Sequence, residues 1–439
     1  MFIFVTLTLC IISTCRIVYA IAIKKDLKLD PHIHLDNQRV YRILLESAPH
    51  GYTHRISAGS RNEEFTVMVT MRNSMLWIPS INCTECGSKR KFDPYKSSSF
   101  TNTGYNWSIQ DDDGTVGGML GIDNLVVEPL ESRMDIAECI FGLATRISDY
   151  DNLEEVDGLF GLLPIARGGM SGRPLMRQIG TLLNPSFTID LSQQSQAGTV
   201  GSVFYGRVWN TDSCVNEASV QIYDQFNPYQ YESKISMGSF KPSHAYKAML
   251  ELIPFISGPP EFVAGIASCA GAEYIDGYYE VNCDEANSIP DLTIAYAQVP
   301  LHISSDKFIT KVGDRCVLAL AVQLGAGLGP DVYLGAPLFK QYCISVNFAE
   351  GWLGFAEVIE APTNSSLKEC KVSTQSTSLA TTIRSTLVTR SSTRSTVLST
   401  RSTQSPHTTE AMDSTTKTTA PAFYQNSLFS LMLSVFLIR

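Results

Sequence analysis

The stretch FTVMVTMRNSMLWIPS, residues 65–80, decides how this chain is interpreted. Its first part, EFTVMVT from residue 64, alternates apolar and other side chains, and a period of two is typical of a half-buried β-strand. Similar short runs with turn residues between them follow along the chain: NWSIQ, NLVVEPL, SFTIDLS, DLTIAYA and CISVNFA. The chain from about residue 50 to residue 358 is therefore predicted to be mainly β.

Helical patterns are few in this region. The clearest covers residues 258–271, with Ser257 as the expected N-cap, prolines in the first turn and Gly271 after the last apolar residue. More than 300 residues of mainly β structure exceed what a single sandwich needs. The sequence thus predicts two β lobes with a cleft between them.

The composition is that of a globular protein with an acidic body. Of the 439 residues, 44% are hydrophobic and 18% are charged, and the formal net charge is −9. Residues 373–439 carry six basic and two acidic side chains and residues 1–20 carry one arginine, which leaves −14 on residues 21–372. Phosphates would be repelled by such a body, so no nucleic-acid partner is expected.

The N-terminus has the pattern of an export signal. Residues 2–14 form an apolar run of signal-peptide length, and Ala20 and Ala22 offer small-residue cleavage sites. We interpret residues 1–20 as a signal peptide. A short membrane anchor is the alternative, but the run is shorter than a spanning helix needs.

The C-terminal part has a composition that does not fold. Residues 373–419 contain 27 Ser or Thr in 47 positions, which favours a mucin-like, O-glycosylated stalk. The apolar run at 428–438 is too short to span a bilayer as a helix. The tail 420–439 matches a GPI-attachment signal, and a weakly hydrophobic terminus of a secreted protein is the alternative.

Three N-x-S/T sequons agree with a secretory route, at Asn82, Asn106 and Asn364. The expected location is therefore extracellular, either secreted or attached to the cell surface through the tail.

Residues 65–80 resemble the segment of pepsin-like aspartic peptidases that carries their first catalytic aspartate. Further segments resemble this family in the same order: FDPYKSSSF (92–100), WSIQDDDGTVGGMLGID (107–123), IFGLAT (140–145), VDGLFGL (156–162), ISGPPEFVAGIASCAGA (256–272), SIPDLT (288–293) and VYLGAPLFKQYCISVNFAEGWLGFA (332–356). The chain is identified as a member of this family over roughly residues 51–358.

The resemblance implies a bilobal fold of two β-barrel-like lobes, an inter-lobe cleft and a few short helices. It also implies a disulfide between Cys283 and Cys316. The expected parts are a signal peptide (1–20), an N-terminal extension that is a candidate remnant propeptide (21–50), an N-terminal lobe (51–205), a C-terminal lobe (206–358), a linker (359–372), the stalk (373–419) and the tail (420–439).

The two Asp-Thr-Gly turns that the family's chemistry needs have been replaced. In the family, two adjacent carboxylates share a proton and activate a water. Aligned without gaps, the first aspartate is Thr70, whose hydroxyl cannot act as a base near neutral or acidic pH. The second is Leu250 without gaps, or Glu251 with one residue deleted. No catalytic residue is therefore expected.

The flap hairpin of the family also differs here. Its tyrosine corresponds to Asp111, followed by Asp112 and Asp113, and we interpret these acids as a solvated hairpin rather than as substitute catalysts. Gly114 and Thr115 keep the turn character of the flap. Trp77 is expected to line the cleft, and core packing is the alternative.

The remaining motifs favour structural roles. The motif CTEC, with Cys83 and Cys86, favours a small disulfide loop over a zinc or redox site. The sequence offers no second pair of zinc ligands, and an exported chain enters an oxidising compartment in which disulfides form. Five cysteines stay unassigned: Cys139, Cys214, Cys269, Cys343 and Cys370. No metal and no cofactor are expected.

Three functions follow from these observations. The preferred one is a non-catalytic, monomeric pepsin-like glycoprotein that binds peptide or protein segments in its cleft. The second is an active aspartic endopeptidase that uses Glu251 and a rearranged partner. The third is a structural surface glycoprotein whose cleft binds nothing.

Overall fold

The computed structural model describes residues 40–359, apart from 112–113, 129–132, 149–154, 166–173, 181–184, 193–198, 207–212, 223, 225–226 and 324–328. Several predictions concern residues outside this part: the signal peptide, Asp112, Asp113, Asn364, Cys370, the stalk and the tail. Among the described residues, no helix is long and apolar enough to cross a membrane.

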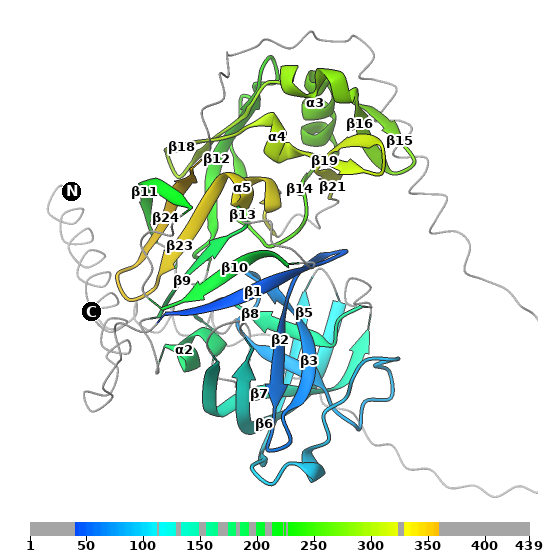
Figure 1. Cartoon of the computed structure of the whole chain (residues 1–439), viewed down its shortest axis with the longest axis vertical. Coiled ribbons are helices and arrows are strands. Elements are labelled where there is room, and N and C mark those ends of the chain that lie inside the picture. The colour runs from blue at the N-terminus through cyan, green and yellow to red at the C-terminus, as the bar shows by residue number, and fades with distance from the viewer. Residues whose placement is uncertain are drawn as a thin grey trace, which may run out of the picture. The chain divides into compact units, whose positions relative to one another are not determined.

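The described chain is mainly β, as the sequence predicts (Figure 1). The strands are β1 (Tyr41–Ala48), β2 (Gly51–Ala58), β3 (Glu63–Thr70), β4 (Leu76–Pro79), β5 (Thr101–Asp111), β6 (Gly114–Val127), β7 (Met134–Ser148), β8 (Gly158–Gly161), β9 (Ser186–Asp190), β10 (Thr199–Tyr205), β11 (Cys214–Gln221), β12 (Gln230–Met237), β13 (Tyr246–Leu250), β14 (Ile256–Gly258), β15 (Glu273–Ile275), β16 (Tyr278–Val281), β17 (Leu292–Tyr296), β18 (Val299–Ile303), β19 (Ile309–Val312), β20 (Arg315–Leu318), β21 (Leu320–Val322), β22 (Val332–Leu334), β23 (Tyr342–Asn347) and β24 (Trp352–Val358). The helices are short: α2 (Leu175–Ile179), α3 (Pro260–Ala270), α4 (Ser305–Phe308), α5 (Ala336–Gln341) and the 3-10 turns η1 (Pro94–Lys96) and η3 (Cys283–Ser288).

Three sheets hold the described strands. The largest has the order β11-β24-β23-β9-β10-β1-β2-β3-β8-β4-β7-β6-β5, the second β18-β17-β12-β13-β22-β14-β21 and the third β15-β16-β20-β19. In the largest sheet, β9 from the first half of the chain pairs with β23 from the second half, with Ile189 opposite Ile344. This sheet joins the two halves, in agreement with the bilobal fold that the resemblance implies.

The two halves repeat one arrangement of four strands. In the first half, β8 runs parallel to β3 and antiparallel to β4, and β4 runs parallel to β7. In the second half, β22 runs parallel to β13 and antiparallel to β14, and β14 runs parallel to β21. The repeat gives the ends of β3 and β13 equivalent positions, and the candidate active site lies at these two ends.

Large aromatic side chains fill both halves and the junction between them. Tyr229, which is fully buried, donates its hydroxyl hydrogen to the Leu162 carbonyl at 2.8 Å and thereby connects the second half to the first. A buried tyrosine needs such a partner for its hydroxyl, while its ring contributes apolar contact. Other fully buried rings include Trp77, Tyr205, Tyr296, Phe65, Phe92, Phe141, Phe160, Phe187, Phe262, Phe308 and Phe339.

The fold begins earlier than the predicted lobe boundary at residue 51. Strand β1 lies within the predicted extension 21–50, yet it pairs with β10 and β2, and Ile43 and Leu45 are completely buried. This part of the extension is therefore a strand of the largest sheet, because its alternate apolar residues complete the core.

The predicted helix 258–271 is present as α3, and Gly271 ends it with a left-handed φ of 67°. The expected N-cap is wrong. Pro259 holds that position, whereas Ser257 belongs to β14 and donates its hydroxyl hydrogen to Gln323 Oε1 at 2.9 Å.

Candidate active site

Thr70 is the last residue of β3 and is 4% exposed. It lies opposite Gly161 of the parallel strand β8. A Cβ at Gly161 would lie 2.4 Å from the Asn73 carbonyl oxygen, so only glycine lets the turn after β3 pack against β8. The end of β3 is thus held closely against its neighbour.

The strand register shows which residue of the second half is equivalent to Thr70. Leu250 lies opposite Leu334, so the next residue, Glu251, stands beside Gly335. A Cβ at Gly335 would lie 2.1 Å from the Phe255 carbonyl oxygen, the same kind of close approach as at Gly161. Glu251 therefore corresponds to Thr70, and Leu250 is a core residue with no exposed surface.

The second turn is shorter than the first by one residue. Trp77 lies opposite Leu159 on β8, and Ser257 lies opposite Tyr333 on β22, which makes Trp77 and Ser257 equivalent. Trp77 comes seven positions after Thr70, whereas Ser257 comes six after Glu251. The sequence left two alignments open: a gap-free one that gives Leu250, and one with a deleted residue that gives Glu251. The strand register agrees with the second.

The Glu251 carboxylate is buried and faces the turn of the first half. Its Oε1 and Oε2 lie 3.2 and 3.1 Å from the Met71 backbone nitrogen, which donates to them, and the side chain is 2% exposed. Arg72 Nε lies 3.6 Å from Oε2, and the Arg72 guanidinium lies 5.7 Å from the centre of the Tyr333 ring. A buried carboxylate requires such donors and a counter-charge.

Thr70 takes part in the turn through its hydroxyl oxygen, which accepts the Arg72 backbone N–H at 3.1 Å. The two positions that the resemblance assigns to the family aspartates thus hold one carboxylate and one hydroxyl. Two carboxylates sharing a proton, the arrangement that activates a water in aspartic peptidases, are not formed by these two side chains.

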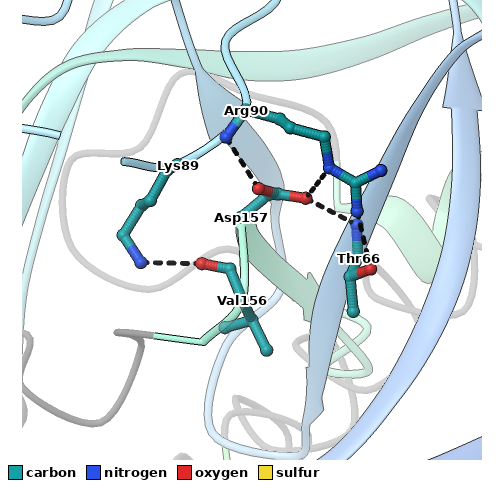
Figure 2. A network of polar contacts seen from close by, with 5 residues as sticks. All are labelled: Thr66, Lys89, Arg90, Val156 and Asp157. Carbon is teal, nitrogen blue, oxygen red and sulfur yellow. Dashed lines mark hydrogen bonds and ion pairs between the residues drawn. The ribbon is translucent and has the colours of Figure 1, made fainter. Parts of the chain in front are cut away.

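A polar network braces the strand pair that ends at this site (Figure 2). Asp157, directly before β8, accepts the backbone N–H groups of Thr66 and Arg90 at 2.8 Å each, and Arg90 Nε lies 2.9 Å from its Oδ2. Arg90 also donates to Thr66 Oγ1 at 2.9 Å, and Lys89 Nζ donates to the Val156 carbonyl at 2.7 Å. These bonds fix β3 against β8 and were not anticipated from the sequence.

The flap segment forms a hairpin of β5 and β6. Asp111 pairs with Gly114, whose φ is 151°, and Thr115 pairs with Gln110 and is exposed. The glycine supplies a conformation that other residues rarely adopt. Asp112 and Asp113 lie outside the described residues.

Trp77 lies in the core instead of along an open surface. Its side chain has no exposed area, and its ring centroid lies 6.3 Å from that of Trp107. This burial agrees with core packing, the alternative interpretation of Trp77. A side chain that lines a cleft and contacts a ligand would need exposed area.

Two cavities lie away from these residues. One of about 40 Å³ is apolar and is lined by Pro164, Ile165, Met176, Arg177, Pro185, Ile222, Pro228, Phe348 and Gly351. The other is an open hollow of about 460 Å³ lined by Asn62, Glu63, Glu64, Phe65, Arg90 and Lys91. Neither is lined by Thr70 or Glu251.

The structure contains the disulfides Cys83–Cys86 and Cys283–Cys316, and also Cys214–Cys343. Among the described cysteines Cys139 is a free thiol, and burial raises its pKa to about 12, so it stays protonated and unreactive. Asp190 lies close to Cys214 and Cys343. Because both sulfurs are bonded to each other, they do not act as thiolate ligands.

Comparison with known proteins gives a consistent assignment. The family model described as eukaryotic aspartyl protease matches residues 51–358. Aspartic protease 6 of Caenorhabditis elegans is 30% identical over 326 residues, which cover 70% of this chain and 82% of that protein. Human gastricsin is 24% identical over 325 residues (70% and 81%), and the renin of Echis ocellatus is 24% identical over 348 residues (75% and 85%). This chain belongs to the eukaryotic aspartyl protease family.

Proposed function

We propose that this chain is an exported, non-catalytic member of its family that binds peptide or protein segments between its lobes. One observation carries the proposal: the buried carboxylate of Glu251 faces the end of β3, where the equivalent residue is Thr70. General acid–base catalysis contributes about 10²–10⁴-fold in rate. In aspartic peptidases it depends on a proton shared by two carboxylates, so a site with one carboxylate lacks it.

The test is a cleavage assay with the purified, secreted protein. Denatured globin should remain intact from pH 3 to pH 6, while an aspartic peptidase of known activity, included as the positive control, cleaves it in the same assay. Peptides that mimic the transition state should bind weakly, because their hydroxyl group needs the carboxylate pair. Robust cleavage that such an inhibitor blocks would refute the proposal.

An active endopeptidase is the second candidate, and the position of Glu251 favours it over other enzymes. With one residue deleted, the resemblance assigns Glu251 to the second catalytic aspartate, and its carboxylate accepts the Met71 backbone N–H. If cleavage is found, Glu251→Gln should abolish it, whereas Glu261→Gln on the exposed start of α3 should leave it unchanged.

Binding and a purely structural role are separated by a peptide-library pull-down. Retention of defined extended peptides, with loss of retention for the scrambled sequences, supports the binding function. Failure to retain any peptide supports the structural surface glycoprotein.

Export is supported by the disulfides, which form in oxidising compartments, and by the exposed positions of Asn82 and Asn106. Attachment through the tail predicts that phospholipase C releases the protein from cells. Recovery of intact residues 428–439 from secreted material, by C-terminal mass spectrometry, would exclude the lipid anchor.

A further inference from the structure

The hairpin of β15 and β16 exposes three large side chains close together. Tyr274, Ile275 and Tyr278 are 44%, 41% and 43% exposed, and all three residues of β15 lie on the surface. Among the described strands, β15 is the edge of its four-stranded sheet, so one side of its backbone has no neighbouring strand (Figure 1). Tyrosine and aliphatic side chains gathered on an exposed edge are typical of interaction surfaces.

The hairpin is held rigidly. Ile275 pairs with Tyr278 across a two-residue turn, in which Asp276 and Gly277 have φ values of 49° and 91°. Positive φ at both positions matches the twist of the two strands. Behind the turn, the ring of Tyr274 packs 5.0 Å from that of the buried Tyr279. A surface fixed in this way loses little conformational freedom on binding.

The charges around the hairpin are unfavourable in the isolated chain. Glu273 lies directly opposite Glu280, and like charges at such positions destabilise a strand pair. Arg315 relieves this in part, because it lies 2.6 Å from Glu280 Oε1 and its guanidinium lies 5.3 Å from the centre of the Tyr278 ring. Arg315 also lies 3.7 Å from Asp276 in the turn, and Glu273 is exposed on the edge strand.

We propose that the β15–β16 hairpin is a docking surface for an extended, basic polypeptide segment of a partner protein. Such a segment adds to the open edge of β15 as a further strand, through backbone hydrogen bonds. Glu273 and Ile275 are two residues apart in β15 and therefore lie on the same face of the strand. The segment carries a Lys or Arg opposite Glu273 and, two residues further along, an apolar side chain opposite Ile275. This surface is separate from Thr70 and Glu251, so the inference stands apart from the proposed function.

The probe is a fluorescent lysine–valine peptide, Lys-Ser-Val-Ser-Lys-Ser-Val, whose lysine and valine side chains fall on one face of an extended strand. It is titrated with the full chain by fluorescence anisotropy. The double variant Ile275→Ser/Tyr278→Ser should weaken binding at least about fivefold, because interface anchors of this kind dominate affinity. Tyr95→Ser is the matched control, since Tyr95 is 85% exposed on another part of the surface. A double variant that binds like the control overturns the proposal.

A second variant separates docking from a structural role. Glu273→Gln removes the repulsion from Glu280, so it should raise the melting temperature. The same variant should lower the affinity for the lysine–valine peptide by about two- to fivefold, because a charge that attracts lysine is lost. Two other results would overturn the proposal. One is equal binding of a glutamate–valine peptide, and the other is self-association of the full chain that Ile275→Ser/Tyr278→Ser abolishes, which would assign the surface to a second copy.

Discussion

The carboxylate of Glu251 is hydrogen-bonded to the backbone N–H of Met71, with its two oxygens 3.2 and 3.1 Å from that nitrogen. Met71 follows β3 and Glu251 follows β13, so this contact joins the two halves of the fold at the equivalent ends of these two strands. Arg72 supplies the counter-charge from the same turn. The Glu251 carboxylate is thus bonded to the turn of the opposite half, which is a structural role for this side chain.

Removal of this carboxylate should destabilise the protein. Glu251→Ala leaves the Met71 N–H and the charge of Arg72 without their partner, and the expected cost is about 3 kcal/mol in the free energy of unfolding. Glu251→Gln should cost less, because its amide oxygen still accepts the N–H. Urea unfolding at pH 7 measures both. Glu261→Ala is the control, and a Glu251→Ala variant as stable as that control would show that the contact is not formed.

His54 should make the fold lose stability in acid. The buried ring donates from Nδ1 to the Leu44 carbonyl at 2.9 Å and accepts at Nε2 from the Tyr205 hydroxyl, 3.1 Å away. Burial lowers its pKa from 6.5 to about 4. Between these values the unfolded chain binds the proton and the folded chain does not, so stability falls as the pH drops from 6.5 to 4, by about 3 kcal/mol in total.

The measurement is the free energy of unfolding against pH for the wild type and for His54→Asn. The variant should lose the slope between pH 6.5 and pH 4, whatever its stability at pH 7. His302→Gln serves as control, because His302 is 46% exposed. An unchanged slope in His54→Asn would mean that another group causes the acid sensitivity.

The mainly β content and the two-lobed plan of this fold could be predicted, but the geometry of the site could not. The alternation of apolar and other side chains in residues 64–70 is a local signal, and it predicts the strand β3 and its buried face. The contact of Met71 with Glu251 joins residues 180 positions apart, so no local pattern encodes it. The choice between Leu250 and Glu251 required the pairing partners on β22, because a one-residue deletion leaves no trace within the turn itself.

Other features escaped prediction for related reasons. Strand β1 carries alternating apolar residues, but its place in the sheet depends on its distant partner β10. The pairing of Cys214 with Cys343 cannot be deduced from spacing alone, since several connectivities are open to any set of cysteines.

Three disulfides whose cysteines both lie in the described part of the chain should contribute unequally to stability. Their sequence separations are 3 for Cys83–Cys86, 33 for Cys283–Cys316 and 129 for Cys214–Cys343. Loop entropy then predicts losses of about 2, 4 and 5 kcal/mol on replacement of each pair by serine. Urea unfolding of the three double variants gives the order, and non-reducing peptide mapping checks that the remaining pairs are unchanged. A largest loss for Cys83–Cys86 would contradict the loop-entropy order.

An aspartate at residue 70 should make the stability of the protein fall as the pH rises. In Thr70→Asp, a second carboxyl group stands beside Met71, whose N–H holds the Glu251 carboxylate, and Arg72 provides only one positive charge for the two acids. Two like charges in a buried place resist joint ionisation, so the pKa of the new carboxyl group is raised above its unfolded value. A raised carboxyl pKa destabilises the folded state progressively as the pH rises above about 4.

Thr70→Asn has the same shape without the charge and should keep the wild-type profile. Thermal unfolding of both variants from pH 4 to pH 8 decides the matter: coincident profiles would show that residue 70 does not face the Glu251 carboxylate, whereas a loss with rising pH in Thr70→Asp alone would show that the carboxyl pair can be rebuilt.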